Sequence, residues 1–424
     1  MNIYKNPSEQ ELKEILKRPA FEQSGLESKV QTILDEVKAH GDDALKNFAQ
    51  KFDGVTLDSL LVSEQEFDEA ENLVDQALKD AIAVAKANIE KFHTAQKNPV
   101  EKVETMPGVV CWREDRPIEK VGLYIPGGTA PLFSTILMLV VPAKVAGCKE
   151  IVLCTPPNKE GKVHPAILYT AKSLGVTTLV KAGGAQAVAA MAFGTESVPS
   201  VYKIFGPGNQ FVTMAKQMVQ TQGLAIDMPA GPSEVLVLSD ETSNPEFIAI
   251  DLLSQAEHGL DSQAIHVTTS LEMAEKVNEA IDRLVAQLSR QEFLNESLKN
   301  SKTVVVETIE GVIDTINEYA PEHLILQNKD YNSLIDEIVN AGSVFLGPYT
   351  PESAGDYASG TNHTLPTNGY AAMYSGVSLD SFVKRVTFQE ISKEGIEKLG
   401  PSIEVMAQEE QLDAHKMAVT LRLK

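Results

Sequence analysis

The residue types best suited to chemistry gather in a few short polar segments in the last two-fifths of this 424-residue chain. The first is Gln255-Ala-Glu-His258, which ends an apolar stretch with helical spacing. Gln255 and His258 are three residues apart, so both side chains are expected to project from one face of the last helical turn. The pair is a candidate for metal binding, although polar helix ends that simply face water are more common.

A second segment, Tyr319-Ala-Pro-Glu-His-Leu324, puts a carboxylate and an imidazole side by side. Pro321 stops a helical pattern here, and a strand-like run follows. The imidazole of His323 can take up a proton near neutral pH, and the carboxylate of Glu322 can activate water. The segment therefore predicts proton-transfer chemistry, with a solvated surface turn as the alternative.

Two later segments are also polar. Residues 347–369 form a stretch without hydrophobic periodicity, and connections longer than about 12–15 residues are usually functional or disordered. Its chemically capable residues are Asp356 and His363. The other segment, Glu409-Glu-Gln-Leu-Asp-Ala-His415, opens the last helical stretch, and taken alone it would be a solvated charged face.

Glycine-rich turns follow three strand-like runs in the middle of the chain. Glycine lets backbone N–H groups approach a phosphate, and the N-terminus of the following helix adds positive potential. Ligands of open α/β sheets bind at such carboxyl ends of strands. None of the turns has the full GxGxxG pattern and each alone can be a plain tight connection, but three together indicate a nucleotide site. The turns are Tyr124-Ile-Pro-Gly-Gly128, Lys181-Ala-Gly-Gly-Ala-Gln186 and Phe205-Gly-Pro-Gly-Asn209.

Helical patterns dominate the first hundred residues. Ser63 and Glu66 have the spacing of a capping box, which predicts the start of one long helix with an apolar stripe over residues 77–89. Shorter helices are expected at residues 8–11, at residues 25–40, and from Asn244-Pro-Glu246 to a terminating Gly259.

From residue 121 the pattern changes to short apolar runs that alternate with amphipathic stretches. This alternation predicts βαβ units and parallel sheets. Nine strands suit two sheets better than one, with a seam near Met228-Pro-Ala-Gly-Pro232. After Gly347 the chain is turn-rich, and from about Ile396 it is mostly helical. The strand-like runs are residues 121–125, 151–154, 177–181, 203–205, 235–238, 264–268, 303–306, 324–326 and 343–346.

The composition excludes several classes of protein. Hydrophobic residues make up 43% and charged residues 23%, the balance of a folded globular chain. A formal net charge of -22 argues against nucleic acid as a partner, because binding phosphates requires clustered Lys and Arg. The most apolar stretch, residues 131–147, is interrupted by polar residues and is shorter than the ~20 residues of a membrane span. The N-terminus lacks the apolar region of a secretion signal, so a cytoplasmic location is expected.

The length and the cysteine count add two constraints. At ~100–200 residues per domain, a chain of this length is expected to contain two or more domains. Cys111, Cys148 and Cys154 form neither an even disulfide framework nor a CxxC pair. Any metal site must therefore use other ligands.

Seven segments, in order and spread almost from end to end, together resemble histidinol dehydrogenases. Ordered strings of this kind are far more specific than any single motif. Two positions depart from the family pattern: Gln411 stands where glycine is expected, and His266 is not expected. The segments are Gly122-Leu-Tyr-Ile-Pro-Gly-Gly128, Gly206-Pro-Gly-Asn209, Ala230-Gly-Pro-Ser-Glu-Val235, Gln255-Ala-Glu-His258, Ala320-Pro-Glu-His323, Ser359-Gly-Thr-Asn-His-Thr-Leu-Pro-Thr367 and Leu412-Asp-Ala-His415.

The resemblance implies one zinc ion per subunit, bound through oxygen and nitrogen atoms, and NAD as the second cofactor. Such ligands suit zinc, and the low cysteine count agrees with them. The implied zinc ligands are Gln255, His258, Asp356 and His415. The implied substrate contacts are these four residues together with Ser233, His323 and Glu410. The implied NAD contacts are Tyr124, Gln186 and Asn209.

For the fold, the resemblance implies an α/β protein with two incomplete Rossmann-like domains, one inserted in the other, and small helical terminal segments. It also implies a homodimer in which the C-terminal segment is exchanged, so that Glu410 and His415 act at the partner's active site. The expected parts are an N-terminal helical segment (residues 1–20), a first domain with the metal and substrate site (21–123 plus 231–375), an inserted domain with the NAD site (124–230) and a C-terminal segment (376–424).

The reaction implied by the resemblance is the four-electron oxidation of L-histidinol to L-histidine through a bound L-histidinaldehyde, the last two steps of histidine biosynthesis. We assign His323 to remove the alcohol proton and to assist the second oxidation, and Glu322 to activate the water that hydrates the aldehyde. Zinc would hold the amino and imidazole nitrogens of the substrate, mainly as an orienting template.

Other functions stay open at this point. Relatives in the family oxidise other hydroxylated compounds, such as sulfonated diols, but Ser233 and Glu410 favour histidinol. A nucleotide-binding regulatory protein would bind NAD without zinc-dependent turnover, and a metal-dependent hydrolase would need no NAD. Aldehyde oxidation through a cysteine is a further route, but Cys111 and Cys148 lie in sequence contexts that indicate packing.

Overall fold

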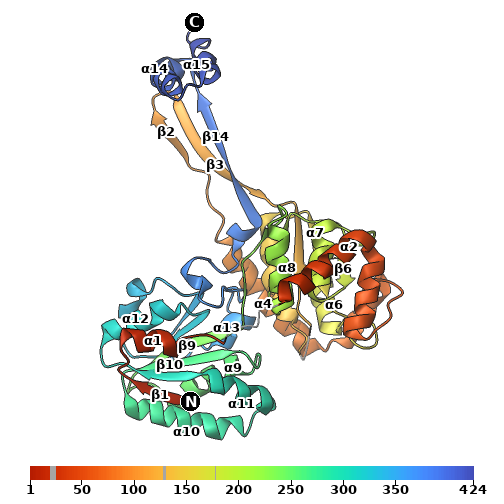
Figure 1. The fold of residues 1–424 in the computed structure, drawn as a ribbon, viewed down its shortest axis with the longest axis vertical. Helices are drawn as coiled ribbons and strands as arrows, with labels where there is room; N and C mark the ends of the chain where they lie inside the picture. Colours follow the sequence, from red (N-terminus) through yellow and green to blue (C-terminus); the bar gives the residue numbers. More distant parts are fainter. Residues whose placement is uncertain (20–24, 128–129, 177) are drawn as a thin grey trace.

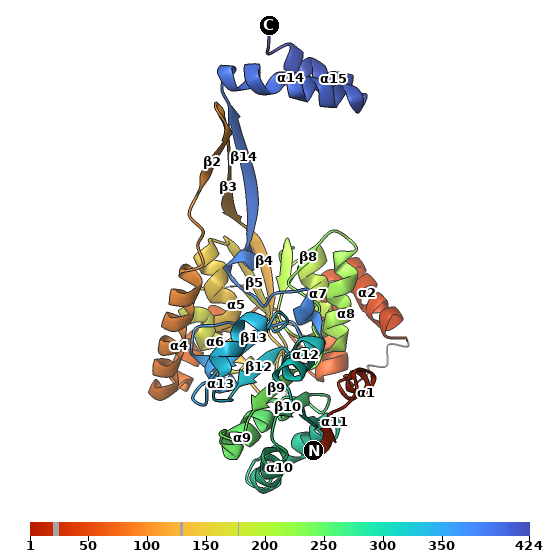
Figure 2. The ribbon, with the colours of Figure 1, turned by 90° about the vertical axis from the view of Figure 1, so that its left-hand side faces the viewer.

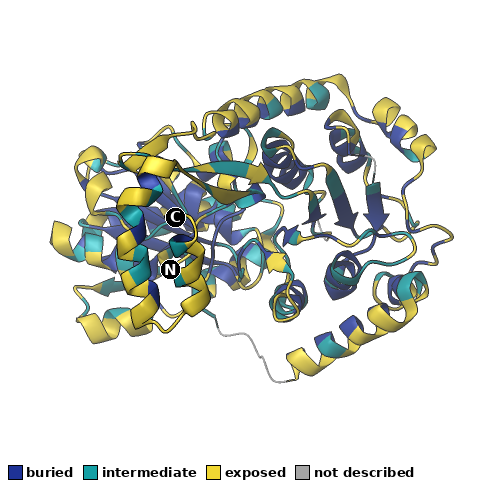
Figure 3. Cartoon of the chain, turned by 90° about the horizontal axis from the view of Figure 1, so that it is seen from above, coloured by how far each residue is buried: buried dark blue, intermediate teal, exposed yellow. Residues whose placement is uncertain are grey.

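The predicted strands assemble into two parallel sheets that form the two halves of the molecular body (Figure 1). The computed structural model describes residues 1–19, 25–127, 130–176 and 178–424. Gly128 of the first glycine turn, Thr177 of a predicted strand, and residues 20 and 21 at the first predicted domain boundary lie outside the described residues. Figure 3 shows buried strands inside each half and helices whose outer faces are exposed.

The larger sheet has six parallel strands in the order β1-β11-β10-β9-β12-β13. Five of them match predicted runs, whereas β1 falls in a segment that was expected to be helical. β1 pairs with β11, with Asn2 opposite Lys302, and so adds the N-terminus of the chain to the edge of this sheet. The strands are β1 (Asn2–Lys5), β9 (Glu234–Ser239), β10 (Gln263–Thr268), β11 (Lys302–Val305), β12 (His323–Leu326) and β13 (Ser343–Leu346).

The smaller sheet has five parallel strands in the order β6-β5-β4-β7-β8. Counted along the chain, both β4 to β8 and β9 to β13 follow the order 3-2-1-4-5 of doubly wound folds. The prediction of an α/β fold with two incomplete Rossmann-like units is therefore confirmed, as is the seam between β8 and β9. The strands are β4 (Lys120–Tyr124), β5 (Glu150–Thr155), β6 (Thr178–Lys181), β7 (Lys203–Phe205) and β8 (Ala225–Ile226).

Helices cover both sheets. Around the six-stranded sheet lie α1 (Glu9–Ile15), α9 (Pro245–Ala256), α10 (Leu271–Val285), α11 (Gln291–Asn300), α12 (Ile309–Tyr319), η2 (Tyr331–Glu337) and α13 (Glu352–Tyr357). Around the five-stranded sheet lie α2 (Leu26–Phe48), η1 (Ala49–Asp53), α3 (Glu64–Leu73), α4 (Gln76–Thr94), α5 (Phe133–Ala146), α6 (Pro165–Ser173), α7 (Gly184–Phe193) and α8 (Gln210–Gln220). Two short turns, η3 (Tyr370–Ala372) and η4 (Leu379–Phe382), lie in the connection that follows residue 369.

The helices α2, α3 and α4 pack with the five-stranded sheet. Leu34 of α2 shares a hydrophobic core with Val188 of α7, and α4 packs against α5. The predicted division, 21–123 plus 231–375, instead grouped these helices with the other sheet. The apolar faces of these helices are buried against the five-stranded sheet and its helices. The other predicted domain limits stay a prediction.

The predicted long helix after Ser63 is wrong in its length. The capping box is confirmed, because the Ser63 hydroxyl accepts from the Glu66 amide and the Glu66 carboxylate accepts from the Ser63 amide. However, Val74 has an extended backbone, and the Asp75 carboxylate caps a new helix by accepting from the amide of residue 78. The chain therefore forms α3 and α4 in place of one helix.

Two other helix ends differ from their predicted positions. α2 continues past the expected end at residue 40 to Phe48, with Gly41 (φ 50) interrupting its regular backbone. α9 ends at Ala256, so His258 lies beyond the helix, and Gly259 does not have the positive φ of a terminating glycine. Gln255 and His258 thus do not share a helical turn as predicted.

An arm leaves the body and carries the C-terminus at its tip (Figure 1, Figure 2). Its stem is a three-stranded antiparallel sheet in the order β14-β3-β2, which the sequence pattern did not predict. The outer stem strands β2 and β14 are mostly exposed and the central strand β3 is half-buried, so the stem lacks the apolar alternation on which a strand prediction depends. The arm comprises β2 (Lys102–Met106), β3 (Val109–Pro117), β14 (Val383–Ile391), α14 (Lys393–Glu409) and α15 (Asp413–Thr420).

Candidate functional site

The candidate active site lies at the amino ends of two neighbouring strands of the six-stranded sheet. Ser233 immediately precedes β9, and Glu322 and His323 stand at the start of β12. The two strands pair with His323 opposite Val235, so side chains at their starts meet at one edge of the sheet. Ligands of open α/β sheets usually bind at the carboxyl ends of strands, and this site lies at the opposite edge.

His323 occupies the centre of a buried acidic cluster. Its Nε2 atom lies 3.5 Å from Asp356 Oδ1, and its Nδ1 atom lies 3.6 Å from Glu322 Oε2 and 3.9 Å from Glu352 Oε1. Burial lowers the pKa of His323, but the negative charges of Glu352 and Glu322 outweigh burial and raise this pKa well above its usual range. Glu322 and His323 are therefore buried together, and the alternative of a solvated surface turn does not apply.

Glu352 belongs to this cluster, although sequence analysis did not single it out. Its side chain is 1% exposed, and neither carboxylate oxygen has a hydrogen-bond partner among the described residues. Glu352 follows Pro351 and opens α13, a position where acidic residues usually interact with the helix N-terminus and water. Nothing in the local sequence therefore indicates its burial.

The same cluster offers ligands for a metal ion. The ligand atoms of His258, Glu352 and Asp356 all lie within 4.8 Å of one another. Gln255 lies in the last turn of α9, which packs against α13, and its fully buried amide has no hydrogen-bond partner in the described part of the chain. Leaving such a group unsatisfied costs roughly 1–3 kcal/mol, which a cation bound to the amide oxygen would offset. The residues fit a divalent cation with oxygen and nitrogen ligands, such as zinc.

Two predicted site residues stand apart from this cluster. Glu410 follows α14 and His415 lies in α15, and both are exposed. Figure 1 shows these helices at the tip of the arm, far from the sheets. Within one chain, the structure does not bring Glu410 and His415 to the other predicted site residues.

A cavity of about 650 Å³ lies at the carboxyl ends of β4, β5 and β6. It is lined by Tyr124, Gln186 and Asn209, the three predicted NAD contacts. The Tyr124 hydroxyl accepts a hydrogen bond from the Gly184 amide at 3.1 Å, and burial raises the pKa of Tyr124 to about 12. Gln186 lies in the first turn of α7 and Asn209 caps α8, so two helix N-termini, which favour phosphate, border this cavity.

A second cavity of about 510 Å³ adjoins the first. Pro126 and Asn209 line both cavities, so the two meet at these residues. The second cavity is lined by Ser233, His258, Glu322, His323, Asp356 and His363, among others.

Comparison with known proteins identifies the family. A family model described as "Histidinol dehydrogenase" matches residues 16–423. The chain belongs to the histidinol dehydrogenase family. The resemblance inferred from seven sequence segments is thus confirmed, and the chain is related to a family of oxidoreductases.

Histidinol dehydrogenases from several bacteria are similar to this chain over nearly its whole length. The protein of that name from Bacteroides thetaiotaomicron (strain ATCC 29148 / DSM 2079 / JCM 5827 / CCUG 10774 / NCTC 10582 / VPI-5482 / E50) is 58% identical over 423 residues, which cover 100% of this chain and 99% of the relative. The one from Escherichia coli (strain K12) is 53% identical over 414 residues, covering 97% and 94% of the two chains. A crystal structure of histidinol dehydrogenase from Elizabethkingia anophelis superposes with a TM-score of 0.98 at 53% identity, covering 100% of this chain and 98% of that chain.

The cysteines of this histidinol dehydrogenase family member lie outside both cavities. Cys148 and Cys154 are buried, and burial raises the pKa of Cys148 to about 11. A buried thiol is a poor nucleophile because the thiolate is the reactive form. The geometry therefore agrees with the packing role expected of Cys148. Among the described helices, none combines the length and the apolar character needed to cross a membrane.

Proposed function

We propose that this protein oxidises L-histidinol to L-histidine in two NAD-dependent steps, with L-histidinaldehyde bound between them. The observation that carries this proposal is the junction of two cavities at Pro126 and Asn209. The first cavity contains the predicted NAD contacts, and the second contains the buried pair Glu322 and His323. A nicotinamide that enters from the first cavity can reach an alcohol carbon beside His323. The substrate follows from the names of the relatives.

Zinc is proposed as the resident metal, held by Gln255, His258 and Asp356, with His415 added from a second subunit. The unsatisfied amide of Gln255 and the repulsion within the buried acidic cluster support a cation here. A bound zinc ion would serve mainly as a template that orients the alcohol carbon, through the amino and imidazole nitrogens of the substrate. Ser233 lines the same cavity and is proposed to contact the substrate.

In the first oxidation, His323 removes the proton of the substrate hydroxyl. The acidic cluster by itself favours protonated His323, and a cation held beside it by His258 and Asp356 would oppose that effect and favour the neutral imidazole. The proton on Nδ1 of the neutral ring faces the carbonyl oxygen of Glu234 at 3.3 Å, and the lone pair of Nε2 acts as the base. The alcohol carbon loses a hydride to NAD and becomes the aldehyde carbon. One proton and one hydride leave, so the two-electron oxidation balances.

In the second oxidation, Glu322 takes a proton from water while the water oxygen attacks the aldehyde carbon. The Glu322 Oε2 atom accepts a hydrogen bond from the Glu234 amide at 3.0 Å, and this bond holds the carboxylate in place. His323 then removes a proton from the hydrate as a second hydride leaves. The product is a carboxylate, and two NADH form for each substrate.

A homodimer with exchanged arms is part of the proposal, since Glu410 and His415 lie at the tip of the arm, away from the body of their own chain. The arm exposes apolar side chains that a second copy would cover. Glu410 then contacts the substrate and His415 completes the metal site across the interface. The exposed arm residues include Val103 (51%), Val405 (69%), Met406 (65%), Met417 (53%) and Leu421 (60%).

The deciding experiment mixes the purified protein with L-histidinol and NAD, with and without a chelator, and counts the NADH formed per substrate. The proposal expects two equivalents, and it expects the chelator to abolish them until zinc is restored. If only one NADH forms for each substrate, the protein oxidises the alcohol but not the aldehyde. Turnover that survives complete removal of the metal would rule out the proposed role of zinc.

A further inference from the structure

The main chain of Glu234, at the start of β9, contacts both residues that are proposed to transfer protons. Its amide donates a hydrogen bond to Glu322 Oε2 at 3.0 Å, and its carbonyl oxygen lies 3.3 Å from His323 Nδ1. One residue of β9 therefore positions two side chains that stand at the start of β12. A shift of this residue would move the carboxylate and the imidazole together.

The side chain of Glu234 is fixed by a guanidinium from the N-terminal part of the chain. Glu234 is 2% exposed, and both of its carboxylate oxygens accept hydrogen bonds from Arg18, which lies 216 residues earlier, after α1. A bidentate arginine–carboxylate pair constrains direction as well as distance, because two N–H groups meet two oxygens. Arg18 thus limits the ways in which Glu234 can turn or shift.

Arg18 is itself held by the end of α12. Its guanidinium donates to the carbonyl oxygen of Tyr319 and lies over the Tyr319 ring, 4.2 Å from the ring centre. The Tyr319 hydroxyl donates to Gln263 Oε1 at 2.9 Å, and Gln263 lies opposite Glu234 in the pairing of β10 with β9. The pair of Arg18 and Glu234 is therefore part of a network that joins α12 to both strands.

Arg18 and Glu234 lie behind the proposed catalytic residues, away from the space for substrate. Neither is among the described residues that line the second cavity, whereas Glu322 and His323 are. A buried ion pair is also a weak source of stability, because the cost of removing two charges from water offsets much of their attraction. The location of the pair points to a role in orienting its neighbours.

We propose that Arg18 and Glu234 form a positioning pair, in which the guanidinium fixes Glu234 and the main chain of Glu234 orients Glu322 and His323 for proton transfer. The inference rests on the proposed function and adds two residues that support both oxidation steps. Because Glu322 and His323 depend on the same residue, loss of the pair slows both hydride transfers. Binding of L-histidinol changes little, since the pair lies outside the second cavity.

The test measures single-turnover rate constants of the zinc-loaded wild type, Arg18→Ala, Glu234→Gln and the double variant. Arg18→Ala should slow oxidation of both L-histidinol and L-histidinaldehyde by roughly 10²-fold, since a displacement of about 1 Å at catalytic groups has this effect. The KM of L-histidinol should change by less than about twofold. The double variant should be no slower than the slower single variant, because the two residues act as one unit.

Added guanidinium provides a second measurement. At concentrations too low to unfold the protein, it should accelerate Arg18→Ala but not the double variant, because the added ion needs the Glu234 carboxylate. Arg18→Lys keeps the charge but lacks the planar fork, so it should also react more slowly than the wild type, by a smaller factor.

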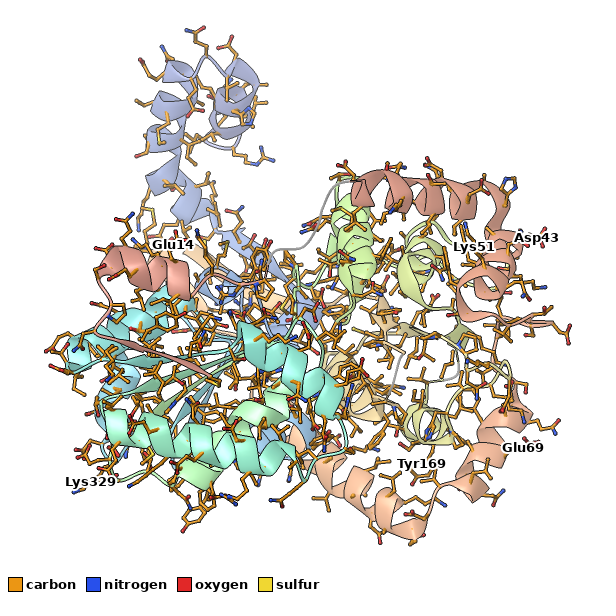
Figure 4. The ribbon with its side chains drawn as sticks, turned by 60° about the horizontal axis from the view of Figure 1, so that its bottom comes forward. Glu14, Asp43, Lys51, Glu69, Tyr169 and Lys329 are labelled. Atoms are coloured by element: carbon orange, nitrogen blue, oxygen red, sulfur yellow. The ribbon has the colours of Figure 1, made fainter. Side chains whose placement is uncertain are left out.

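Lys17→Ala is the matched control. Lys17 precedes Arg18 in the chain, and its ammonium group pairs with Glu14 at the surface. Figure 4 shows Glu14 on the outer side of α1. Loss of this exposed charge should leave both rate constants at their wild-type values.

A role in stability alone predicts a different result. A partly unfolded variant would lose amplitude in single turnover, while its folded molecules would react with the wild-type rate constants. Wild-type rate constants in a folded Arg18→Ala or Arg18→Lys protein would overturn the inference, as would acceleration of the double variant by guanidinium. If the wild type forms two NADH and the Arg18 variants react normally, only this inference fails. If the wild type forms no NADH from L-histidinol, the proposed function fails and the inference fails with it.

Discussion

Two buried carboxylates lie at the starts of β9 and β12, and they differ in their partners. Glu234 receives two hydrogen bonds from the guanidinium of Arg18, at 2.6 and 2.8 Å, so its charge is neutralised. Glu322 instead accepts a hydrogen bond from a backbone amide of the neighbouring strand. Glu322 also lines the second cavity, where the substrate is proposed to bind, whereas Glu234 does not. This difference favours Glu322 as the base that activates water.

The variant Glu322→Gln is therefore expected to slow aldehyde oxidation by about 10²–10⁴-fold, since the amide cannot accept a proton from water. The first hydride transfer should change little, because it uses His323. Single-turnover measurements that start from L-histidinol or from L-histidinaldehyde separate the two steps. Glu318→Gln, on the exposed surface of α12, is the matched control. An equal loss in both half-reactions would argue against this role.

Replacing Gln255 is expected to affect the stability of the metal-free protein and its affinity for zinc in opposite directions. Gln255→Leu removes a buried amide that has no partner, so the metal-free variant should be at least as stable as the metal-free wild type. Its zinc affinity should fall by at least about tenfold. Thermal unfolding with and without zinc, together with the bound zinc content, tests both statements. Ser254→Ala in the same turn is the control, and an equal stabilisation of variant and wild type by zinc would contradict the prediction.

At the scale of elements, strands and helices are predictable where their burial requires a regular pattern of apolar residues in the sequence. Nine of the eleven described strands in the two parallel sheets are predictable, because strands such as β9 and β10 are buried on both faces. The stem strand β14 is mostly exposed in one chain, so its sequence carries no such pattern. The break between α3 and α4 also depends on a local detail, the capping carboxylate of Asp75, which looks like an ordinary surface acid.

The candidate site shows the same division. Glu322 and His323 were recognisable because they follow a helix stop and start a strand, whereas Glu352 becomes conspicuous only through burial without partners among the described residues. Gln411, which departs from the expected glycine, has φ 59 between α14 and α15. That left-handed backbone explains why glycine suits this position.

A buried histidine in β10, next to β9, is expected to make the unfolding free energy depend on pH. Nε2 of His266 lies 2.8 Å from the Ser239 hydroxyl, and burial lowers the pKa of His266 from 6.5 to about 3. Between these values the unfolded chain binds a proton that the native chain does not. The native state therefore loses stability as the pH falls through 6.5, and this loss stops growing below about pH 3, where both states bind the proton.

Comparison with His266→Gln isolates this contribution. Between pH 7 and pH 5 the wild type should lose about 2 kcal/mol more of its unfolding free energy than the variant loses. Urea unfolding of both proteins at the two pH values measures the difference. Parallel pH profiles would show that the imidazole of His266 remains able to take up a proton in the native state.

At the scale of the whole molecule, the arm separates two predicted site residues from the rest. If arms are exchanged, a chain with a defective arm and a chain with a defective body can form one intact site between them. Mixing His415→Ala with His323→Ala chains, after co-refolding, should restore about a quarter of wild-type activity by random pairing. Each variant alone should be inactive. No recovery in a confirmed mixed dimer would place all site residues within one chain.

The edge strand β1 pairs with a strand about 300 residues later in the chain, since Asn2–Lys5 lies beside Lys302–Val305. During synthesis the partner of β1 does not exist until the ribosome has passed residue 305. At about 5–20 residues per second, the first strand waits roughly 15–60 s before it can pair. During that time the backbone donors and acceptors of β1 are free to pair with other strands. The larger sheet is therefore completed late in synthesis of the chain.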